Sequence, residues 1–401
     1  MPNGTVNSFR IFDIGSSDGF TEIKPCTANG SRKEDAVSSS DLKEMILKSL
    51  NQPKRQKSIA TFLLYDELGL QLFDEITRLE EYYLTNAERT ILQDHADELA
   101  GRVNNGTIIV ELGSGSLTKT QLILRAMERN KKCVTYYALD LNRNELERSL
   151  SSLDGPFKYI QLVGLVGTYD QAIPWLKQQY PNKTTQKLVL WLGSSVGNHT
   201  RRESAIFLRQ FVCSCLQPGD FVVIGFDRRN DPSTVLKAYN DEHGITGKFI
   251  MNCLSHVNSI LGEPFFNLDD FEYHSTYQEN YGRHVSHFRA KRAVNLVYRK
   301  ERLSDDVTIP VEQGELIHLE FSHKYSNSEI AQLLEAAELD LVQTWSDSNF
   351  LYRLVLSRHH PVQSRNDDDV IDKFFPYDNG SDRICDQNEF LECSMCNTKT
   401  I

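Results

Sequence analysis

Short apolar runs alternate with segments of helical periodicity between residues 107 and 226, and this alternation constrains the fold more than any other feature. Strands buried on both faces appear as continuous apolar runs, and intervening helices allow neighbouring strands to run parallel. The pattern therefore predicts an α/β fold, with a Rossmann-like parallel sheet and helices on both faces. The expected strands are 108–110, 133–139, 159–165, 188–192 and 221–226, and the expected helices are 118–129, 142–151, 169–179 and 202–215.

The flanking regions have different patterns. Residues 1–40 are rich in Ser, Gly, Asp and Asn and are expected to form a disordered lead. Residues 232–325 break the alternation, so we expect an inserted α+β domain that binds substrate and includes the helical part 41–100. The core at 101–231 is then completed by residues 326–358, and the polar tail 359–401 is expected to be disordered.

A glycine-bearing loop follows the first strand of the core. Gly113 and Gly115 allow the backbone to approach a ligand closely, and Asp140 ends the next strand, where a carboxylate can accept hydrogen bonds from both ribose hydroxyls. Nicotinamide-binding folds share this pairing, and a turn without any ligand is a further alternative. Leu117 replaces the third glycine that a pyrophosphate requires, and Glu111 suits a cationic ligand, so the loop favours S-adenosylmethionine.

Composition excludes several classes of partner. The net charge of −11 argues against nucleic acid, and no apolar run approaches the roughly 20 residues of a membrane span. The N-terminus lacks a secretion signal, and the eight cysteines are spread widely, so a cytoplasmic protein with reduced thiols is expected. Cys393 and Cys396 have the spacing of half a metal site, but no second pair follows, and no metal is expected.

A series of ordered motifs extends from Lys57 to Arg358. The longest are 64–69 (LYDELG), 80–88 (EEYYLTNAE), 136–141 (YYALDL), 192–198 (LGSSVGN), 238–241 (AYND) and 320–325 (EFSHKY). In these motifs the chain resembles the histidine-specific methyltransferase family. That family includes the ergothioneine-pathway enzyme that trimethylates histidine, and its fungal branch also includes dimethylallyltryptophan N-methyltransferase.

The resemblance implies a role for individual residues. Gly113, Lys119 and Asp140 match the family's cofactor contacts, and Gly167, Thr168 and Tyr169 match its adenine-binding segment, with 164–166 as an alternative register. The amine and carboxylate of an amino acid would be bound by Tyr82, Asn198 and Tyr239, and an imidazole by Glu320 and Ser322. Tyr65 matches a tyrosine of the reaction cavity, so the candidate catalytic residues are Tyr65, Tyr82 and Asn198.

Three functions remain open at this point. The first is methylation of the α-amino group of histidine to its trimethyl betaine, hercynine. The second is N-methylation of a tryptophan- or tyrosine-derived amino acid, because Ser286 stands where bacterial histidine enzymes have a bulkier methionine. Only a short tail follows Arg358, where fungal histidine enzymes carry a further module, and this also keeps the second open. The third is an inactive regulatory protein that binds the cofactor.

Individual residues also have structural alternatives. Asn198 could cap a helix, and Glu320 could be an exposed strand glutamate. The partner expected is a small-molecule amino acid bound by a monomer.

Overall fold

The computed structural model describes residues 7–15, 21–23, 39–181, 184–299, 306–360 and 367–376. The chain divides into two compact units. Of the described residues, those before residue 24, those from 83 to 229 and those from 323 to 376 form the sheet unit, and those from 39 to 82 and from 230 to 322 form the smaller unit.

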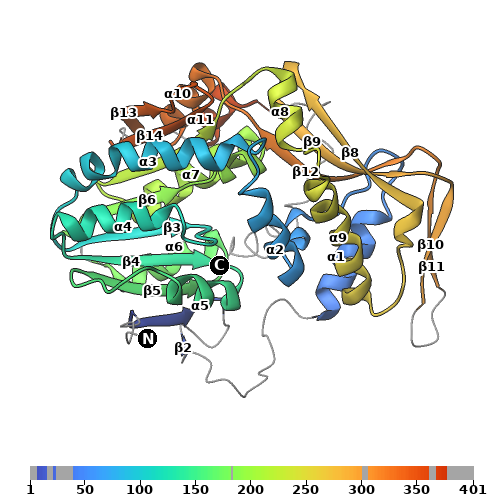
Figure 1. Cartoon of the computed structure of the whole chain (residues 1–401), viewed down its shortest axis with the longest axis horizontal. Helices are drawn as coiled ribbons and strands as arrows, with labels where there is room; N and C mark the ends of the chain where they lie inside the picture. The colour runs from blue at the N-terminus through green and yellow to red at the C-terminus, as the bar shows by residue number, and fades with distance from the viewer. Residues whose placement is uncertain are drawn as a thin grey trace. The chain divides into compact units, whose positions relative to one another are not determined.

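A nine-stranded sheet forms the centre of the sheet unit (Figure 1), with the order β13-β14-β7-β6-β3-β4-β5-β1-β2. The six strands from β7 to β1 are parallel. At one edge β14 is antiparallel to β7 and β13 is antiparallel to β14, and at the other edge β2 is antiparallel to β1. The predicted Rossmann-like α/β fold is confirmed. The strands are β1 (Phe9–Asp13), β2 (Thr21–Ile23), β3 (Thr107–Leu112), β4 (Val134–Asp140), β5 (Ile160–Val166), β6 (Lys187–Trp191), β7 (Phe221–Asp227), β13 (Leu339–Ser346) and β14 (Tyr352–His359).

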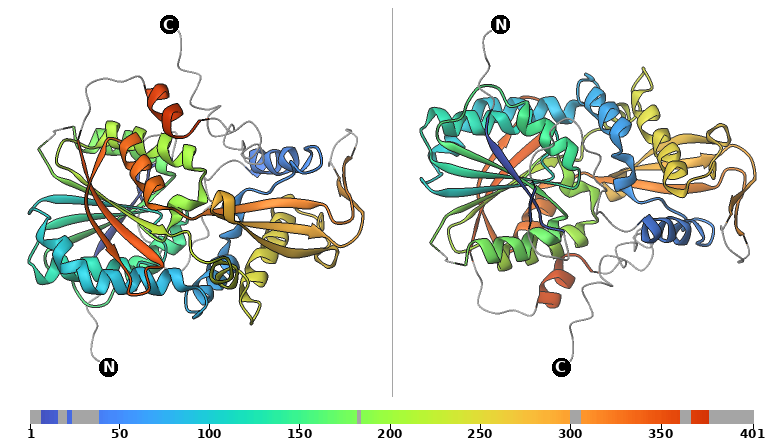
Figure 2. Two further views of the ribbon diagram at one scale, coloured as in Figure 1. Left: turned by 90° about the horizontal axis from the view of Figure 1, so that it is seen from above. Right: turned by 90° about the horizontal axis from the view of Figure 1, so that it is seen from below.

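Helices cover both faces of this sheet, as Figure 2 shows edge-on. One face carries α3 (Tyr83–Gly101), α4 (Thr120–Arg129) and α5 (Arg143–Ser151), and the other carries α6 (Tyr169–Gln179), α7 (Arg201–Cys215) and α10 (Asn327–Ala336). Capping boxes at Thr168, Thr200 and Ser326 begin α6, α7 and α10. The strand order reverses between β3 and β6, which is where open α/β sheets bind ligands at the carboxyl ends of their strands.

The expected disordered lead at residues 1–40 requires correction. Phe9–Asp13 form β1, which pairs in parallel with β5, and Ile11 is fully buried against Gly164. Five residues in a polar surrounding give too weak a pattern for a strand, and the pairing with β5 supplies what the local sequence lacks. Residues 1–6, 16–20 and 24–38 lie outside the described part.

The expected disordered tail also requires correction over one segment. Asp367–Phe374 form α11, and Phe375 packs into the apolar core beside α7 and α10. Arg202 donates to Asp372 Oδ1 at 2.6 Å and to the carbonyl oxygen of Phe375 at 2.7 Å. The segment is therefore attached to the sheet unit, while residues 377–401, with Cys393 and Cys396, lie outside the described residues.

The smaller unit combines helices with antiparallel strands. A three-stranded sheet has the order β12-β9-β8, and β10 pairs with β11 separately. Helix α9 (Ile245–Leu261) contacts α1 (Ser39–Leu50) and α2 (Glu67–Ile76). The other described elements of this unit are α8 (Pro232–Ala238), β8 (Phe271–Gln278), β9 (Arg283–Ala290), β10 (Val294–Tyr298), β11 (Val307–Val311), β12 (Leu316–His323) and the short 3-10 helices η1 (Thr61–Leu64), η3 (Leu268–Asp270) and η4 (Glu279–Tyr281).

The division differs from the expected one at α3. Residues 83–100 were expected in the substrate domain, but α3 packs on α4 and β14 of the sheet unit. The buried residues of α3, such as Ile91, Leu92 and Leu99, form the apolar face of this helix, and that face packs against the sheet unit.

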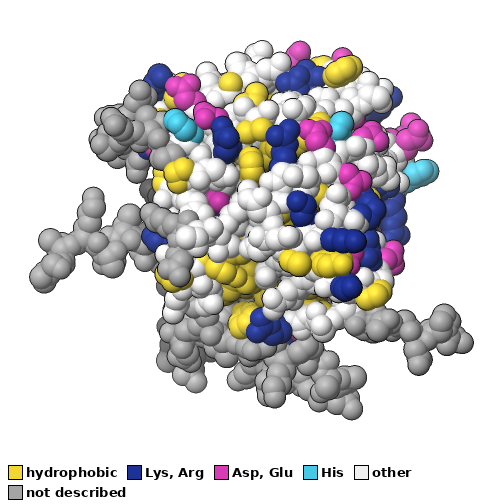
Figure 3. Space-filling view, turned by 90° about the vertical axis from the view of Figure 1, so that its left-hand side faces the viewer, with side chains coloured by type: hydrophobic (Ala, Val, Ile, Leu, Met, Phe, Trp, Pro, Cys, Tyr) yellow, Lys and Arg dark blue, Asp and Glu magenta, His cyan; other side chains and the backbone are white. Residues whose placement is uncertain are grey.

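The surface and the helices give two further observations. On the face that Figure 3 shows, basic and acidic side chains are interspersed, with apolar side chains between them. Among the helices that the structure describes, none is both long enough and apolar enough to cross a bilayer.

Candidate functional site

The glycine loop continues directly from a fully buried strand, β3. Gly113 and Gly115 have φ values of +69° and +52°, in the left-handed region that favours glycine. A Cβ on Gly113 would lie 2.5 Å from the Tyr169 hydroxyl, whereas nothing lies within 4 Å of a Cβ position on Gly115. The loop therefore contacts one predicted adenine-segment residue and leaves open space beside Gly115, which fits a bound nucleoside.

Asp140 lies at the carboxyl end of β4, against the same loop. Its Oδ2 accepts a hydrogen bond from the Gly115 amide at 3.0 Å, and its Oδ1 accepts one from the Asn142 amide at 3.1 Å. Burial raises the pKa of the Asp140 carboxyl, and these backbone amides act in the opposite direction. The loop and the carboxylate thus form one structure, as the cofactor prediction requires.

The predicted adenine segment follows β5 and begins α6. The Gly167 amide donates to the Asp140 carbonyl oxygen at 3.1 Å, so this turn is adjacent to the glycine loop. Thr168 is the N-cap of α6, and its hydroxyl accepts from the Gln171 amide at 3.2 Å. The alternative register, 164–166, lies inside β5, which favours Gly167, Thr168 and Tyr169.

Lys119 pairs with a carboxylate that the sequence analysis did not select. The Lys119 ammonium contacts Glu88 on α3, whose side chain is fully buried. Glu88 also accepts hydrogen bonds from the Gly193 amide at 2.9 Å and from the Tyr352 hydroxyl at 2.8 Å. This carboxylate therefore connects the start of α4, the loop after β6, and β14. Glu88 falls within the matched motif 80–88, which was the one available signal.

Glu111 does not have the position expected for it. Its side chain is buried inside the sheet unit, where it accepts a hydrogen bond from Thr120 at 2.7 Å and another from the Tyr136 hydroxyl. Burial raises the pKa of the Glu111 carboxyl to about 7, against the effect of these two hydroxyls. The carboxyl group that we expected to face a cationic ligand instead makes hydrogen bonds within the protein.

This raised pKa predicts a pH-dependent stability. The folded protein retains a proton on Glu111 that the unfolded chain releases above pH 4.5. The contribution of Glu111 to the free energy of unfolding is therefore fully present below pH 4.5 and is lost as the pH rises to about 7. In the wild type we expect the free energy of unfolding to fall on the order of 3 kcal/mol over this range because of Glu111, and we expect this fall to be absent in Glu111→Gln. Urea unfolding between pH 4.5 and 8 measures it, with the exposed Asp94→Asn as control. Parallel pH profiles for wild type and Glu111→Gln would contradict the assignment.

Asn198 lies after β6, at the carboxyl edge of the sheet. It ends a short 3-10 helix, η2 (Ser195–Asn198), and its side chain is half-buried. The N-cap of the following helix α7 is Thr200, whose hydroxyl accepts from the Glu203 amide at 3.1 Å. The helix-cap alternative for Asn198 is therefore wrong, and its role in binding stays a prediction.

Three of the predicted substrate residues meet within the smaller unit. The hydroxyls of Tyr239 and Ser322 are hydrogen-bonded at 2.8 Å, and both side chains are buried. The ring of Tyr82 meets that of Tyr239 edge-to-face, with centroids 5.9 Å apart. Tyr65 belongs to the same group of aromatic residues through Phe73, whose ring lies 5.8 Å from Tyr65 and 6.3 Å from Tyr82.

Glu320 and Ser286 lie close to this group. Glu320 alternates with Ser322 along β12, so both side chains point to the same face of the three-stranded sheet. Burial raises the pKa of the Tyr273 hydroxyl to about 12, a hydrogen bond with Ser286 opposes this, and the charge of Glu320 adds to it. Ser286 therefore lies within hydrogen-bonding reach of Tyr273, and the charge of Glu320 acts on the same hydroxyl. Because Glu320 is half-buried, it is not the exposed strand glutamate of the alternative.

Two further residues of this face were not selected from the sequence. His284 is buried and stacks on Tyr239 with ring centroids 4.1 Å apart. Its Nε2 is hydrogen-bonded to Ser275 at 2.7 Å, and the Tyr273 hydroxyl donates to the Tyr239 carbonyl oxygen at 2.8 Å. The alternation of polar residues along β8 and β9 was the signal that could have identified them.

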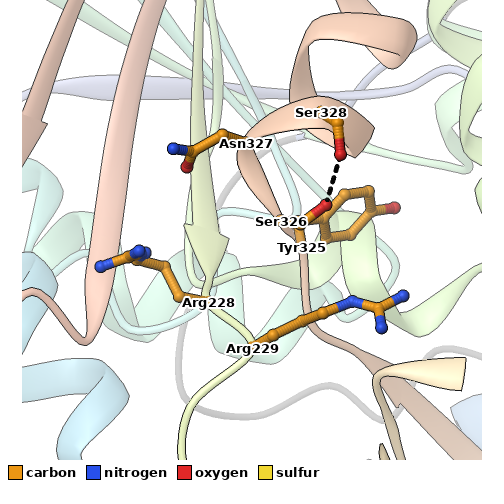
Figure 4. A pocket seen from close by; sticks show the side chains of 6 residues that line it. All are labelled: Arg228, Arg229, Tyr325, Ser326, Asn327 and Ser328. Carbon is orange, nitrogen blue, oxygen red and sulfur yellow. Dashed lines mark hydrogen bonds between the residues drawn. The ribbon is translucent and has the colours of Figure 1, made fainter. Parts of the chain in front are cut away.

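A hollow of about 460 Å³ lies elsewhere in the sheet unit, beside the start of α10 (Figure 4). It is lined by none of the predicted cofactor residues. Arg229 pairs with Glu329 at 2.5 Å, and the hydroxyls of Ser326 and Ser328 are hydrogen-bonded to each other at 3.0 Å. Because these groups already have partners, we do not place the cofactor there. The residues that line this hollow are Arg228, Arg229, Tyr325, Ser326, Asn327 and Ser328.

A family model for histidine-specific, S-adenosylmethionine-dependent methyltransferases matches residues 42–359. The chain belongs to this family. The open loop at Gly115, with Asp140 beside it, fits the S-adenosylmethionine that the family uses.

Curated relatives of this methyltransferase fall into two groups. Ergothioneine biosynthesis protein 1 of Neurospora crassa is 42% identical over 306 residues, which cover 75% of this chain and 33% of that protein. The protein of the same name from Schizosaccharomyces pombe is 35% identical, with 75% and 39% covered. N-methyltransferase imqF of Aspergillus flavus is 31% identical over 317 residues, covering 78% of this chain and 83% of imqF. The chain thus spans well under half of the two ergothioneine proteins.

Proposed function

We propose that this protein is an N-methyltransferase that methylates the α-amino group of an amino acid, with histidine as the leading candidate. S-adenosylmethionine, when bound, supplies a sulfonium methyl group: before each transfer the substrate ammonium releases a proton to solvent, the neutral amine nitrogen then forms the new bond to carbon, the carbon–sulfur bond breaks and S-adenosylhomocysteine leaves. The residues of the chain would bind, orient and desolvate the two reactants.

The amine requires partners that orient it without keeping it protonated. Tyr82, Tyr239 and Asn198 offer hydroxyl and amide groups, which hydrogen-bond an amine without stabilising an ammonium as strongly as a carboxylate would. Tyr239 is held by its contacts with Ser322 and His284, so its hydroxyl is preorganised. We assign amine and carboxylate binding to these three residues, and Tyr65 to the wall of the reaction cavity.

One observation supports histidine in particular. Glu320 and Ser322 point from β12 to the face that carries Tyr239, and a half-buried carboxylate is stabilised by a hydrogen bond from an imidazole N–H. The 42% identity to an ergothioneine biosynthesis protein agrees with this choice.

A second candidate is an amino acid with an indole or phenol side chain. Ser286 is buried and small, so it leaves room on the same face for a larger ring than a methionine there would. The similarity to imqF, and to the 4-dimethylallyltryptophan N-methyltransferase easF of Aspergillus fumigatus at 28% identity, agrees with this alternative.

A methylation screen over free amino acids, read by mass spectrometry, tests the proposal. We expect histidine to gain three methyl groups, with stoichiometric release of S-adenosylhomocysteine. Turnover of an indole or phenol amino acid without turnover of histidine would replace the first candidate by the second. If no amino acid is methylated while S-adenosylhomocysteine still binds, the N-methyltransferase proposal fails and the regulatory alternative gains support.

A further inference from the structure

A carboxylate of the sheet unit, on Asp227, has partners from three separate parts of the chain. Its Oδ2 lies 2.6 Å from the Lys324 ammonium, and both side chains are fully buried. Its Oδ1 accepts a hydrogen bond from the Tyr83 hydroxyl at 2.8 Å. The Asp227 amide donates to the hydroxyl of Ser194 at 3.0 Å, and its carbonyl oxygen accepts from the Tyr325 amide at 2.8 Å.

These partners coincide with the places where the chain enters or leaves the sheet unit. The chain enters the unit at Tyr83, leaves it after Arg229 and enters it again at His323. Tyr83, Asp227 and Lys324 therefore each lie within two residues of one of these three crossings, which are three of the five boundaries between the units. One buried carboxylate connects the sheet-unit side of these three crossings.

Each of three partners of Asp227, namely Tyr83, Lys324 and Ser194, is close in the chain to a candidate substrate residue. Tyr82 precedes Tyr83, and Ser322 lies two residues before Lys324. Ser194, which has a left-handed φ of 57°, begins the turn that ends at Asn198. A further contact supports this turn, because the His323 Nδ1 is hydrogen-bonded to the Gly197 carbonyl oxygen at 3.1 Å.

We infer that Asp227 is a positioning residue for methyl transfer, which sets the backbone next to Tyr82, Asn198 and Ser322 through Tyr83, Ser194 and Lys324. The inference rests on the proposed function, because those three residues are assigned to the amino acid there. Asp227 itself acts only through its partners.

A purely stabilising role is a poor explanation for this network. A buried ion pair contributes little net stability, since desolvation of the two charges offsets their attraction, and an apolar pair of similar volume often does as well. What the carboxylate adds is a fixed geometry, because a charged acceptor with two directional donors tolerates little displacement. The expected consequence of its loss is therefore imprecision in substrate binding as well as lower stability.

The same unit supplies a matched control. Lys187 and Asp220 form a second buried ion pair, with the ammonium 3.7 Å from the carboxylate and side-chain exposures of 5% and 2%. Asp220 also accepts hydrogen bonds from the amides of Lys187 and Gln217. This pair lies at the opposite, amino-terminal ends of β6 and β7, away from every candidate site residue.

The experiment compares Tyr83→Phe, Asp227→Asn and Asp220→Asn in the full chain. Tyr83→Phe removes one hydrogen bond and keeps the ring, so it remains informative if Asp227→Asn does not fold. For the amino acid that the wild type methylates, we expect Tyr83→Phe to raise KM about tenfold and Asp227→Asn more than that, while S-adenosylhomocysteine affinity changes less than about threefold. Asp220→Asn should lower the urea midpoint without changing KM.

Amide hydrogen exchange tests the same inference without any turnover. Tyr83→Phe should accelerate exchange together in segments 80–86, 192–199 and 320–326, whereas Asp220→Asn should do so around 185–190 and 217–222. Unchanged exchange in the first three segments, or equal KM values in Tyr83→Phe and Asp220→Asn, would overturn the inference. A wild type that methylates no amino acid would instead refute the proposed function, and the exchange pattern would still decide whether Asp227 connects the three segments.

Discussion

Replacing Glu88 by alanine is expected to abolish cofactor binding and to lower the free energy of unfolding by about 3–5 kcal/mol. The carboxylate is fully buried and accepts from the Gly193 amide and the Tyr352 hydroxyl while it pairs with Lys119. Its removal leaves the Lys119 ammonium without its counterion at the start of α4, directly after the glycine loop. The amide of Gly193, in the loop after β6, loses its acceptor at the same time.

Urea unfolding and calorimetric titration with S-adenosylhomocysteine measure the two effects. Asp97→Ala is the matched control, because Asp97 lies on the same helix, is exposed and pairs with the exposed Arg129. Exposed pairs contribute less than about 1 kcal/mol, so this variant should bind the cofactor product as the wild type does. If Glu88→Ala does not fold, Glu88→Gln preserves the shape and removes only the charge. Wild-type affinity in a folded Glu88 variant would show that the pair with Lys119 does not support the cofactor site.

The sequence predicted the sheet core well because its strands are buried on both faces. Each strand from β3 to β7 has a continuous apolar run whose ends agree within one or two residues with the structure. The glycine loop and Asp140 could also be predicted, since a positive φ and a strand end are local properties. The edge strand β1 could not, because pairing with β5 rather than local sequence makes it a strand.

Charged residues were the least predictable part of the site. The sequence places Glu111 beside a cationic ligand and gives no sign that Glu88 is buried, yet both carboxyl groups are buried in hydrogen-bond networks. The partners of Glu88 are as distant in the chain as Tyr352, so only the folded sheet brings them together. The helix-cap alternative for Asn198 could have been rejected from the sequence, because Thr200 and Glu203 have the spacing of a capping box that begins two residues later.

The amino-acid site was predicted by family resemblance rather than by pattern. No periodicity connects Tyr82, Tyr239 and Ser322, which come from three distant segments of the smaller unit. The structure brings these three together and adds His284 and Tyr273, which pack against Tyr239. Glu320 is the residue of this group that can distinguish one side chain from another, and it therefore gives the sharpest test of substrate choice.

Glu320→Ala is expected to weaken binding of histidine by about 10- to 100-fold and to leave S-adenosylhomocysteine affinity unchanged. The carboxylate is half-buried on β12, and an imidazole N–H that loses this acceptor also loses a charge-assisted hydrogen bond. Calorimetric titration of each ligand measures both affinities. Glu272→Ala is the control, since Glu272 lies half-buried on the opposite face of the same three-stranded sheet and pairs with Arg289. Equal losses of histidine and cofactor binding would refute the imidazole assignment.

A second single variant, Ser286→Met, distinguishes the two candidate substrates when its effect is compared with that of Glu320→Ala. Ser286 is buried beside Tyr273, so a methionine there would occupy volume on the face that carries Glu320. If histidine is the substrate, the imidazole is small enough to tolerate the methionine, and Glu320→Ala is the more damaging change. If an indole amino acid is the substrate, its larger ring loses its space, and Ser286→Met is the more damaging change while Glu320→Ala costs little. The rank order of the two variants thus reports the size and hydrogen bonding of the side chain of the amino acid that the wild type methylates.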